Sequence, residues 1–151
     1  MIKFIIPKGH IMRHFPGSGE PGSVFFAKSP ADLLTAAAHE FPDVFKDAVP
    51  DPADGRKRLS FVSEKEIGLC NVVALSDLTV EEAASMTEED RDGCLARVVK
   101  TKRTFPTREF QVILGEDNTV ITLFPGPLAP PLPKRGDHSE FWDNHVFIVQ
   151  D

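Results

Sequence analysis

The sequence predicts an α+β fold, and three local patterns lead to that prediction. Residues 29–45, "SPADLLTAAAHEFPDVF", have the capping and apolar spacing of a helix. Residues 108–124, "REFQVILGEDNTVITLF", alternate in polarity on both sides of a loop, as in a β-hairpin. The chain then closes on the strand-like "VFIVQ". We therefore expect one domain over residues 1–151, with an antiparallel sheet of about four to six strands and its helices on one side.

The N-terminal part is expected to hold one short strand and two helical segments. "KFIIP" resembles a short edge strand that Pro7 stops, and "GHIMRHF" has the length of about two helical turns. "PGSGEPGS" has the composition of a loop. Ser29 is a good N-cap for the next helix, whose first position suits Pro30.

The middle of the chain combines strands with two oppositely charged segments. "LSFVSEKEIGLCNVVAL" predicts two strands with a break near Gly68. Residues 77–92 contain seven acidic residues and one basic residue, and we expect them to form a short acidic helix that is a solvated face or a lid. The following "CLARVVKTKRTFPTR" contains five cations and no acid, and is expected to be a basic strand.

The C-terminal tail is proline-rich and then helical. "PGPLAPPLPKRGD" should be extended, "SEFWDNH" should be a short helix capped by Ser139, and "VFIVQ" should be the last strand. A PxxP segment can bind an aromatic groove of a partner protein. Because this tail ends in a helix and a strand, we favour packing on its own domain, anchored by Phe141 and Trp142.

Composition limits the classes of function. The net charge of −6 argues against a protein that coats nucleic acid non-specifically, because that task requires an excess of cations. No apolar run approaches the roughly 18 residues of a membrane-spanning helix, so we expect no membrane partner and a cytoplasmic location. Cys70 and Cys94 are expected to be reduced residues of the core. Tyrosine is absent, so acid/base chemistry would rest on His, Asp, Glu or Lys.

His10 and His14 are the first candidate catalytic residues. On an α-helix a spacing of four places both on one face, as in zinc sites. No glutamate lies between them, and Arg13 opposes a metal ion there; a third ligand would have to be His39, His138 or His145. One imidazole accepting a proton while another donates one fits better. Exposed or capping histidines remain an open alternative.

Other candidates lie on the predicted strands and at the last helix. Lysine and arginine side chains on a strand can hold a phosphodiester, although a basic edge strand also prevents aggregation. This group consists of Lys100, Lys102, Arg103 and Arg108. By alternation Thr122 shares a face with Val120 and Phe124, which would hold its hydroxyl rigidly. His145 follows the short helix, whose dipole favours the charged imidazole.

Two resemblances add expectations to this interpretation. "IGLCNVVALSD", "ARVVKTKRT", "GPLAPPLP" and "FWDNHVFI" resemble, in order, a family of small uncharacterised bacterial proteins with a GPxxPPxP…FWxxH tail. That similarity covers residues 67–149, departs from the pattern at Val146, where alanine is expected, and implies no activity.

The organisation is also similar to the barnase/EndoU/colicin/RelE-like RNase superfamily, chiefly in "DNTVITLFP" and more loosely in "HIMRH". The resemblance implies RNA cleavage without a metal or cofactor, by internal transfer to the 2′-hydroxyl. His10 or His14 would transfer protons, with His145 in reserve. Lys100, Lys102 or Arg103 would hold the phosphate, and Thr122 would position it. The acidic overall charge departs from the usual basic toxin domain.

Three functions therefore stay open. The first is an RNase-like domain, which requires the early histidines, Thr122 and a cation to meet in one cleft. The second is a non-catalytic protein that binds a partner protein through the acidic helix or the proline-rich tail. The third is a metal-dependent hydrolase built on His10 and His14.

Overall fold

The computed structural model describes residues 3–7, 10–15 and 23–150. Its helices are η1 (His10–His14), α1 (Pro30–Glu40), α2 (Pro42–Lys46), η2 (Leu75–Asp77), α3 (Val80–Ala84), η3 (Glu116–Asn118) and α4 (Glu140–Asp143), where η marks a 3₁₀-helix. Its strands are β1 (Val24–Phe25), β2 (Lys57–Val62), β3 (Gly68–Leu69), β4 (Val72–Ala74), β5 (Thr87–Arg91), β6 (Cys94–Thr101), β7 (Pro106–Thr107), β8 (Glu109–Leu114), β9 (Val120–Pro125) and β10 (His145–Gln150).

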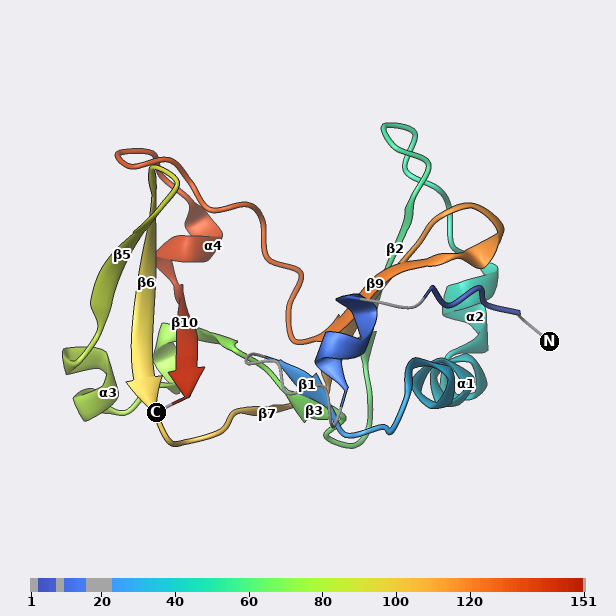
Figure 1. Ribbon diagram of the computed structural model, residues 1–151, viewed down its shortest axis with the longest axis horizontal. Coiled ribbons are helices and arrows are strands. Elements are labelled where there is room, and N and C mark those ends of the chain that lie inside the picture. Colours follow the sequence, from blue (N-terminus) through green and yellow to red (C-terminus); the bar gives the residue numbers. More distant parts are fainter. Residues whose placement is uncertain (1–2, 8–9, 16–22, 151) are drawn as a thin grey trace.

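The predicted α+β class is confirmed, but the strands of the described residues form three sheets instead of one. Their orders are β2-β8-β9, β4-β10-β6-β5 and β1-β3-β7. All pairs of neighbouring strands are antiparallel except β10 and β6, which run parallel. Figure 1 shows α1 and α2 beside the first sheet, α3 and α4 beside the second, and the small third sheet between these two halves.

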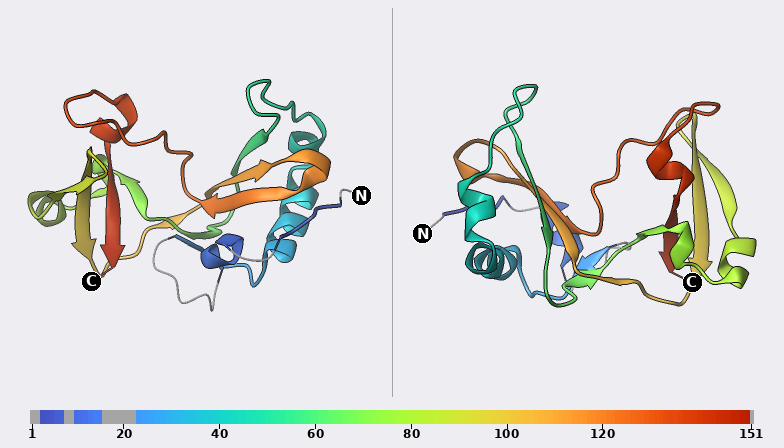
Figure 2. Two further views of the ribbon diagram at one scale, coloured as in Figure 1. Left: turned by 45° about the horizontal axis from the view of Figure 1, so that its top comes forward. Right: turned by 180° about the vertical axis from the view of Figure 1, so that it is seen from behind.

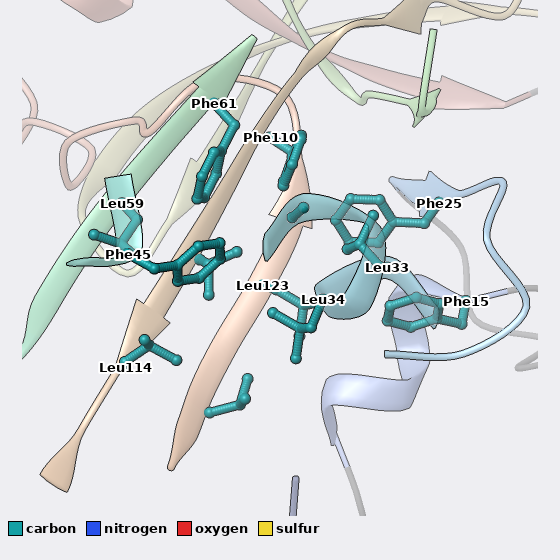
Figure 3. Close-up of a cluster of buried hydrophobic side chains, with 13 residues drawn as sticks. Phe15, Phe25, Leu33, Leu34, Phe45, Leu59, Phe61, Phe110, Leu114 and Leu123 are labelled. Atoms are coloured by element: carbon teal, nitrogen blue, oxygen red, sulfur yellow. The ribbon is translucent and has the colours of Figure 1, made fainter. Parts of the chain in front are cut away.

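Among the described residues, the larger of two buried hydrophobic clusters joins α1 and α2 to the sheet β2-β8-β9 (Figure 3). Alternation along β2 turns Leu59 and Phe61 inward and leaves their neighbours exposed. Phe61 stacks on Phe110 with ring centroids 4.7 Å apart. Leu33 and Leu34 contribute the apolar stripe of α1.

The second cluster belongs to the sheet β4-β10-β6-β5. Its buried members are Val73, Val99, Phe105, Val146 and Ile148. On the end of this sheet near α4, the Trp142 ring stacks on Phe147 with centroids 4.7 Å apart. Each half of the molecule therefore has apolar packing of its own.

Local capping explains α1 as predicted. The Ser29 hydroxyl accepts a hydrogen bond from the Asp32 backbone N–H at 3.2 Å, and Pro30 is the first helical residue. The helix ends at Glu40. Pro42 then begins the separate helix α2, because proline is favoured in a first turn but cannot donate a backbone hydrogen bond.

The prediction of an acidic helix over residues 77–92 is wrong for its second half. A capping box at Thr79 and Glu82 starts α3, which ends after five residues. Residues 87–91 are instead the strand β5, which pairs antiparallel with β6. The connection is the two-residue turn Asp92–Gly93, with φ of 53° and 82°. Two positive φ values match the twist of a tight hairpin, and Asp-Gly is a preferred sequence there.

The proline-rich segment packs on its own chain, as we favoured. The indole N–H of Trp142 donates to the Pro130 carbonyl oxygen at 2.8 Å. The Cys94 thiol lies 3.6 Å from the Leu132 carbonyl oxygen, and Arg135 bonds the Asp90 carboxylate. In the views of Figure 2, this segment arches between the two halves before it reaches α4. No helix in the described part of the chain is both long and apolar enough to cross a bilayer.

Candidate functional site

His14 and Thr122 lie in the same half of the molecule, on η1 and β9. The His14 Nδ1 is 3.0 Å from the Ser23 carbonyl oxygen, and the imidazole is 6.3 Å from the Phe124 ring. Phe124 is two residues beyond Thr122 on β9, so both side chains lie on one face of the strand. The structure therefore brings the histidine of η1 to the strand that carries the predicted hydroxyl.

The predicted face of Thr122 is only partly right. The register between β8 and β9 shifts at Ile113 and Leu114, so one extra residue is inserted in β9. As a result Val120 and Leu123 are both buried, whereas Thr122 is half-buried on the opposite face. A bulge of this kind reverses the alternation, which a period of two cannot predict.

The predicted helical turns are present, but η1 is a 3₁₀-helix and not the α-helix on which the shared face of His10 and His14 was predicted. With about three residues per turn, positions four apart differ by roughly a third of a turn around the axis. The side chain of His10 lies outside the described part of the structure. Among the residues that are described, no three His, Cys, Asp or Glu side chains are grouped so that they could hold a metal ion.

The two predicted lysines do not meet these residues. Lys100 lies on β6 and Lys102 follows it, and both side chains are exposed. Strand β6 is in the sheet with β10, and the views of Figures 1 and 2 agree that this sheet lies apart from η1 and β9. Arg108 is exposed at the junction of β7 and β8. The convergence that the RNase hypothesis requires is therefore absent for Lys100 and Lys102.

Arg103 is held by other groups of the protein. Its guanidinium donates to both Glu82 carboxylate oxygens, at 2.6 and 3.1 Å, and to the Asp77 carbonyl oxygen at 2.9 Å. The same guanidinium stacks over the Phe105 ring at 4.1 Å. Arg103 thus connects α3 and η2 to the end of β6. Its positive charge is already paired with the Glu82 carboxylate.

His145 lines a hollow of about 480 Å³ between the two halves. Its Nδ1 lies 2.8 Å from the Phe141 carbonyl oxygen, and its ring stacks on Phe141 with centroids 3.8 Å apart. A carbonyl oxygen can only accept a hydrogen bond, so Nδ1 is the nitrogen that donates. This contact does not use the other ring nitrogen, Nε2. The hollow is also lined by the carboxylates of Asp77 and Glu109, the thiol of Cys70 and the guanidinium of Arg103.

The surroundings of Cys70 in this hollow disfavour its thiolate form. Burial raises the pKa of its thiol, and the carboxylates of Glu109 and Asp77 raise the pKa further. Reactive cysteines need the opposite environment, with nearby cations that stabilise the thiolate. Both Cys70 and Cys94 are free and half-buried.

The acidic segment forms an exposed surface around β5, which we call the acidic edge and define as Glu88, Glu89, Asp90 and Asp92. Within the described residues β5 pairs only with β6, so its other side is an open sheet edge. All five residues of β5 are exposed. Arg91 forms an ion pair with Glu89, and Arg135 forms one with Asp90. The acidic residues are evident in the sequence, but their position on a sheet edge is not. It follows from the Asp92–Gly93 turn, which pairs β5 with β6.

The Arg103–Glu82 pair predicts an acid-dependent loss of stability. The hydrogen bonds from Arg103, and after them the Thr79 backbone N–H, lower the pKa of Glu82 from 4.5 to about 2. A carboxyl with a lowered folded-state pKa stabilises the protein above its unfolded value, and this contribution is lost as the pH falls from about 4.5 to about 2. We expect Glu82→Gln to lose less stability than the wild type over this interval. Urea denaturation at each pH measures the free energy of unfolding of both proteins. If this free energy falls equally with pH in the two, the lowered pKa of Glu82 is contradicted.

Comparisons with known proteins add no relative from which a role could be carried over. No protein-family model matches the chain, and searches of curated proteins and of solved structures found no match either.

Proposed function

We propose that the protein is a non-catalytic binding module, and that the acidic edge on β5 pairs with a basic, extended segment of a protein partner. The single observation that carries this proposal is a strand at the end of its sheet, among the described residues, whose five residues are all exposed and include three carboxylates. An exposed edge offers backbone donors and acceptors to an added strand.

The charges of β5 select the kind of strand that could be added. Alternate side chains share a face, so Glu88 and Asp90 point to one side and Glu89 to the other. A partner strand with lysine or arginine opposite these positions gains a favourable cross-strand pair with Glu88, and competes with Arg91 and Arg135 for Glu89 and Asp90. The nearby carboxylates of Asp77, Glu81 and Asp92 form no ion pair within the described residues, so the surrounding field also attracts cations.

The same charges disfavour pairing of two copies of this chain. If two β5 strands met antiparallel and centred on Glu89, that residue would face its own copy and each Glu88 would face an Asp90. Like charges directly opposite destabilise a sheet. The edge is therefore protected from self-association but open to a cationic strand, as expected for a selective binding surface.

A peptide titration tests this proposal. We expect a peptide of alternating lysine and threonine to bind, with affinity that falls as salt rises, because salt screens exposed charges. The double variant Glu88→Lys/Glu89→Lys should weaken binding about tenfold, since each exposed pair contributes roughly 0.2–1 kcal/mol and both are reversed. Isothermal titration calorimetry measures both effects.

Two controls separate strand addition from simple charge attraction. The variant Glu64→Lys/Glu66→Lys makes the same change in net charge at exposed positions in the other half, and should bind like the wild type. A peptide of equal charge that contains alternating prolines lacks the donors for a strand ladder, and should bind weakly. Equal affinity of the two peptides, or unchanged affinity of the β5 variant, would contradict the proposal.

RNA cleavage is the second candidate function, and the composition of the His145 hollow favours it. An imidazole and the Glu109 carboxylate line the same space, and Thr104 and Thr107 add hydroxyl donors. One group would remove the proton of the 2′-hydroxyl as that oxygen bonds to phosphorus. The other would protonate the departing 5′-oxygen, leaving a cyclic phosphate. This function ranks second because Asp77 and Glu109 repel phosphate and Arg103 is already paired with Glu82.

Incubation of RNA with the purified protein in EDTA tests the second function. Cleavage that persists in EDTA, disappears in His145→Gln and remains in His39→Gln would support it, because His39 is exposed on α1 away from this hollow. RNA that stays intact with the wild-type protein would refute it.

A further inference from the structure

A second hollow, of about 670 Å³, lies where α1 and α2 meet the sheet β2-β8-β9 and the N-terminal segment. Its walls are mainly apolar, from Phe4, Ala38, Phe45 and Leu114. Phe45 and Leu114 are buried members of the larger hydrophobic cluster, and Phe4 packs edge-on against Phe45 with centroids 5.5 Å apart. The hollow is thus an extension of the core surface that no side chain of the described residues fills, and its size is in the range of small-molecule sites.

The charged groups at this hollow all have one sign. Lys46 and Lys57 line it, His39 adds an imidazole, and no aspartate or glutamate is found among its described lining residues. Neither lysine forms an ion pair within the described residues. In a chain of net charge −6, an apolar hollow with cations and no carboxylate is the reverse of the average surface.

We propose that this hollow binds a fatty-acid-like ligand, a single carboxylate on an unbranched hydrocarbon chain. The chain would cover the apolar walls at Phe4, Phe45 and Leu114, which removes hydrocarbon surface from water. The carboxylate would accept charge-assisted hydrogen bonds from Lys46 and Lys57. This site is separate from the acidic edge on β5 and does not depend on the function proposed for it.

The two parts of the site distinguish this ligand from related amphiphiles. An alcohol of equal chain length would fill the apolar walls but leave the ammonium groups without an anion. A quaternary ammonium amphiphile would place a cation beside two lysines and be repelled. The order of affinity should therefore be carboxylate, then alcohol, then quaternary ammonium.

Titration with decanoate, decanol and decyltrimethylammonium, each below the concentration at which it forms micelles, tests this inference. We expect decanoate to bind at least about tenfold more tightly than decyltrimethylammonium and to raise the melting temperature of the protein. Lys46→Met/Lys57→Met should weaken decanoate about tenfold with little effect on decanol. Lys28→Met, at an exposed lysine outside this hollow, should bind like the wild type.

A variant that fills the hollow tests the apolar part independently. Ala38 is half-buried on its wall, and Ala38→Leu should weaken all ligands that enter it. Circular dichroism checks that each variant is folded; if Ala38→Leu does not fold, the lysine variants alone decide. Failure of decanoate to bind would overturn the proposal. So would equal affinity for the cationic amphiphile, or unchanged decanoate affinity in Lys46→Met/Lys57→Met.

Discussion

Phe61→Ala is expected to lower the free energy of unfolding by about 3–5 kcal/mol, the usual cost of emptying a buried aromatic site. The Phe61 side chain is 2% exposed, stacks on Phe110, and contacts the rings of Phe41 and Phe45 at centroid distances of 5.2 Å each. Its removal leaves a cavity that these three rings cannot fill by moving together, because they come from β8, from α2 and from the residue between α1 and α2. Such a loss is a large part of the stability of a typical domain, which totals roughly 5–15 kcal/mol.

Val62→Ala is the matched control for this prediction. Val62 is the next residue on β2 but is 67% exposed on the other face, so its truncation should change stability by less than about 0.5 kcal/mol. Urea denaturation followed by far-ultraviolet circular dichroism measures both variants. Similar losses for the two would contradict the burial pattern of β2. If Phe61→Ala does not fold, Phe61→Leu should show a smaller loss in the same direction.

Trp142→Ala is expected to have an effect of similar size, about 3–5 kcal/mol, in the other half of the molecule. The indole stacks on Phe147 and meets Phe141 edge-on, and its N–H holds the Pro130 carbonyl. Because this contact joins α4 to the proline-rich segment, the variant should also expose residues 126–139 to proteases. Trp142→Phe keeps an aromatic ring but removes the N–H donor, and should cost roughly 1 kcal/mol of that total.

Circular dichroism must follow the Trp142 variants, because Trp142 is the only tryptophan and its fluorescence is lost with it. Limited proteolysis of the wild type and both variants reports on residues 126–139. A loss below about 0.5 kcal/mol for Trp142→Ala, with unchanged proteolysis, would show that the proline-rich segment is held by other contacts.

The single domain over residues 1–151 stays a prediction. Trp142 fluorescence reports on the half with β10, whereas the larger hydrophobic cluster belongs to the half with β8. If both halves unfold as one unit, fluorescence and circular dichroism of the wild-type protein should give coincident transitions, and Phe61→Ala should shift both equally. Separate transitions would indicate two units.

Elements with complete local signals could be predicted from the sequence. Ser29 and Ser139 cap α1 and α4 as expected, and the β8–β9 hairpin forms around the predicted loop, although a register shift interrupts the alternation in β9. Strand β5 could not be predicted from composition, because its glutamates favour a helix while the Asp92–Gly93 turn pairs this segment with β6. The parallel pairing of β10 with β6 joins residues about fifty positions apart in the chain, and no local pattern encodes it.

The candidate site was predicted less well than the fold for the same reason. Placing His14 beside β9 requires only that η1 pack on the nearest sheet, whereas joining it to Lys100 requires knowing which strands share a sheet. The sequence showed the cations of residues 97–108 as a group. The structure separates them: Arg103 is paired with Glu82, and Lys100 is exposed on a sheet to which β9 does not belong.

Amide hydrogen exchange of the protein with the lysine–threonine peptide is the most direct test of the proposal that β5 accepts a basic strand. Strand addition predicts slower exchange at the backbone N–H groups of residues 87–91 that point away from β6. Strand β2, which also ends a sheet but carries Lys57 and Arg58, should exchange at its original rate. Bound peptide with unchanged exchange along β5 would contradict the account.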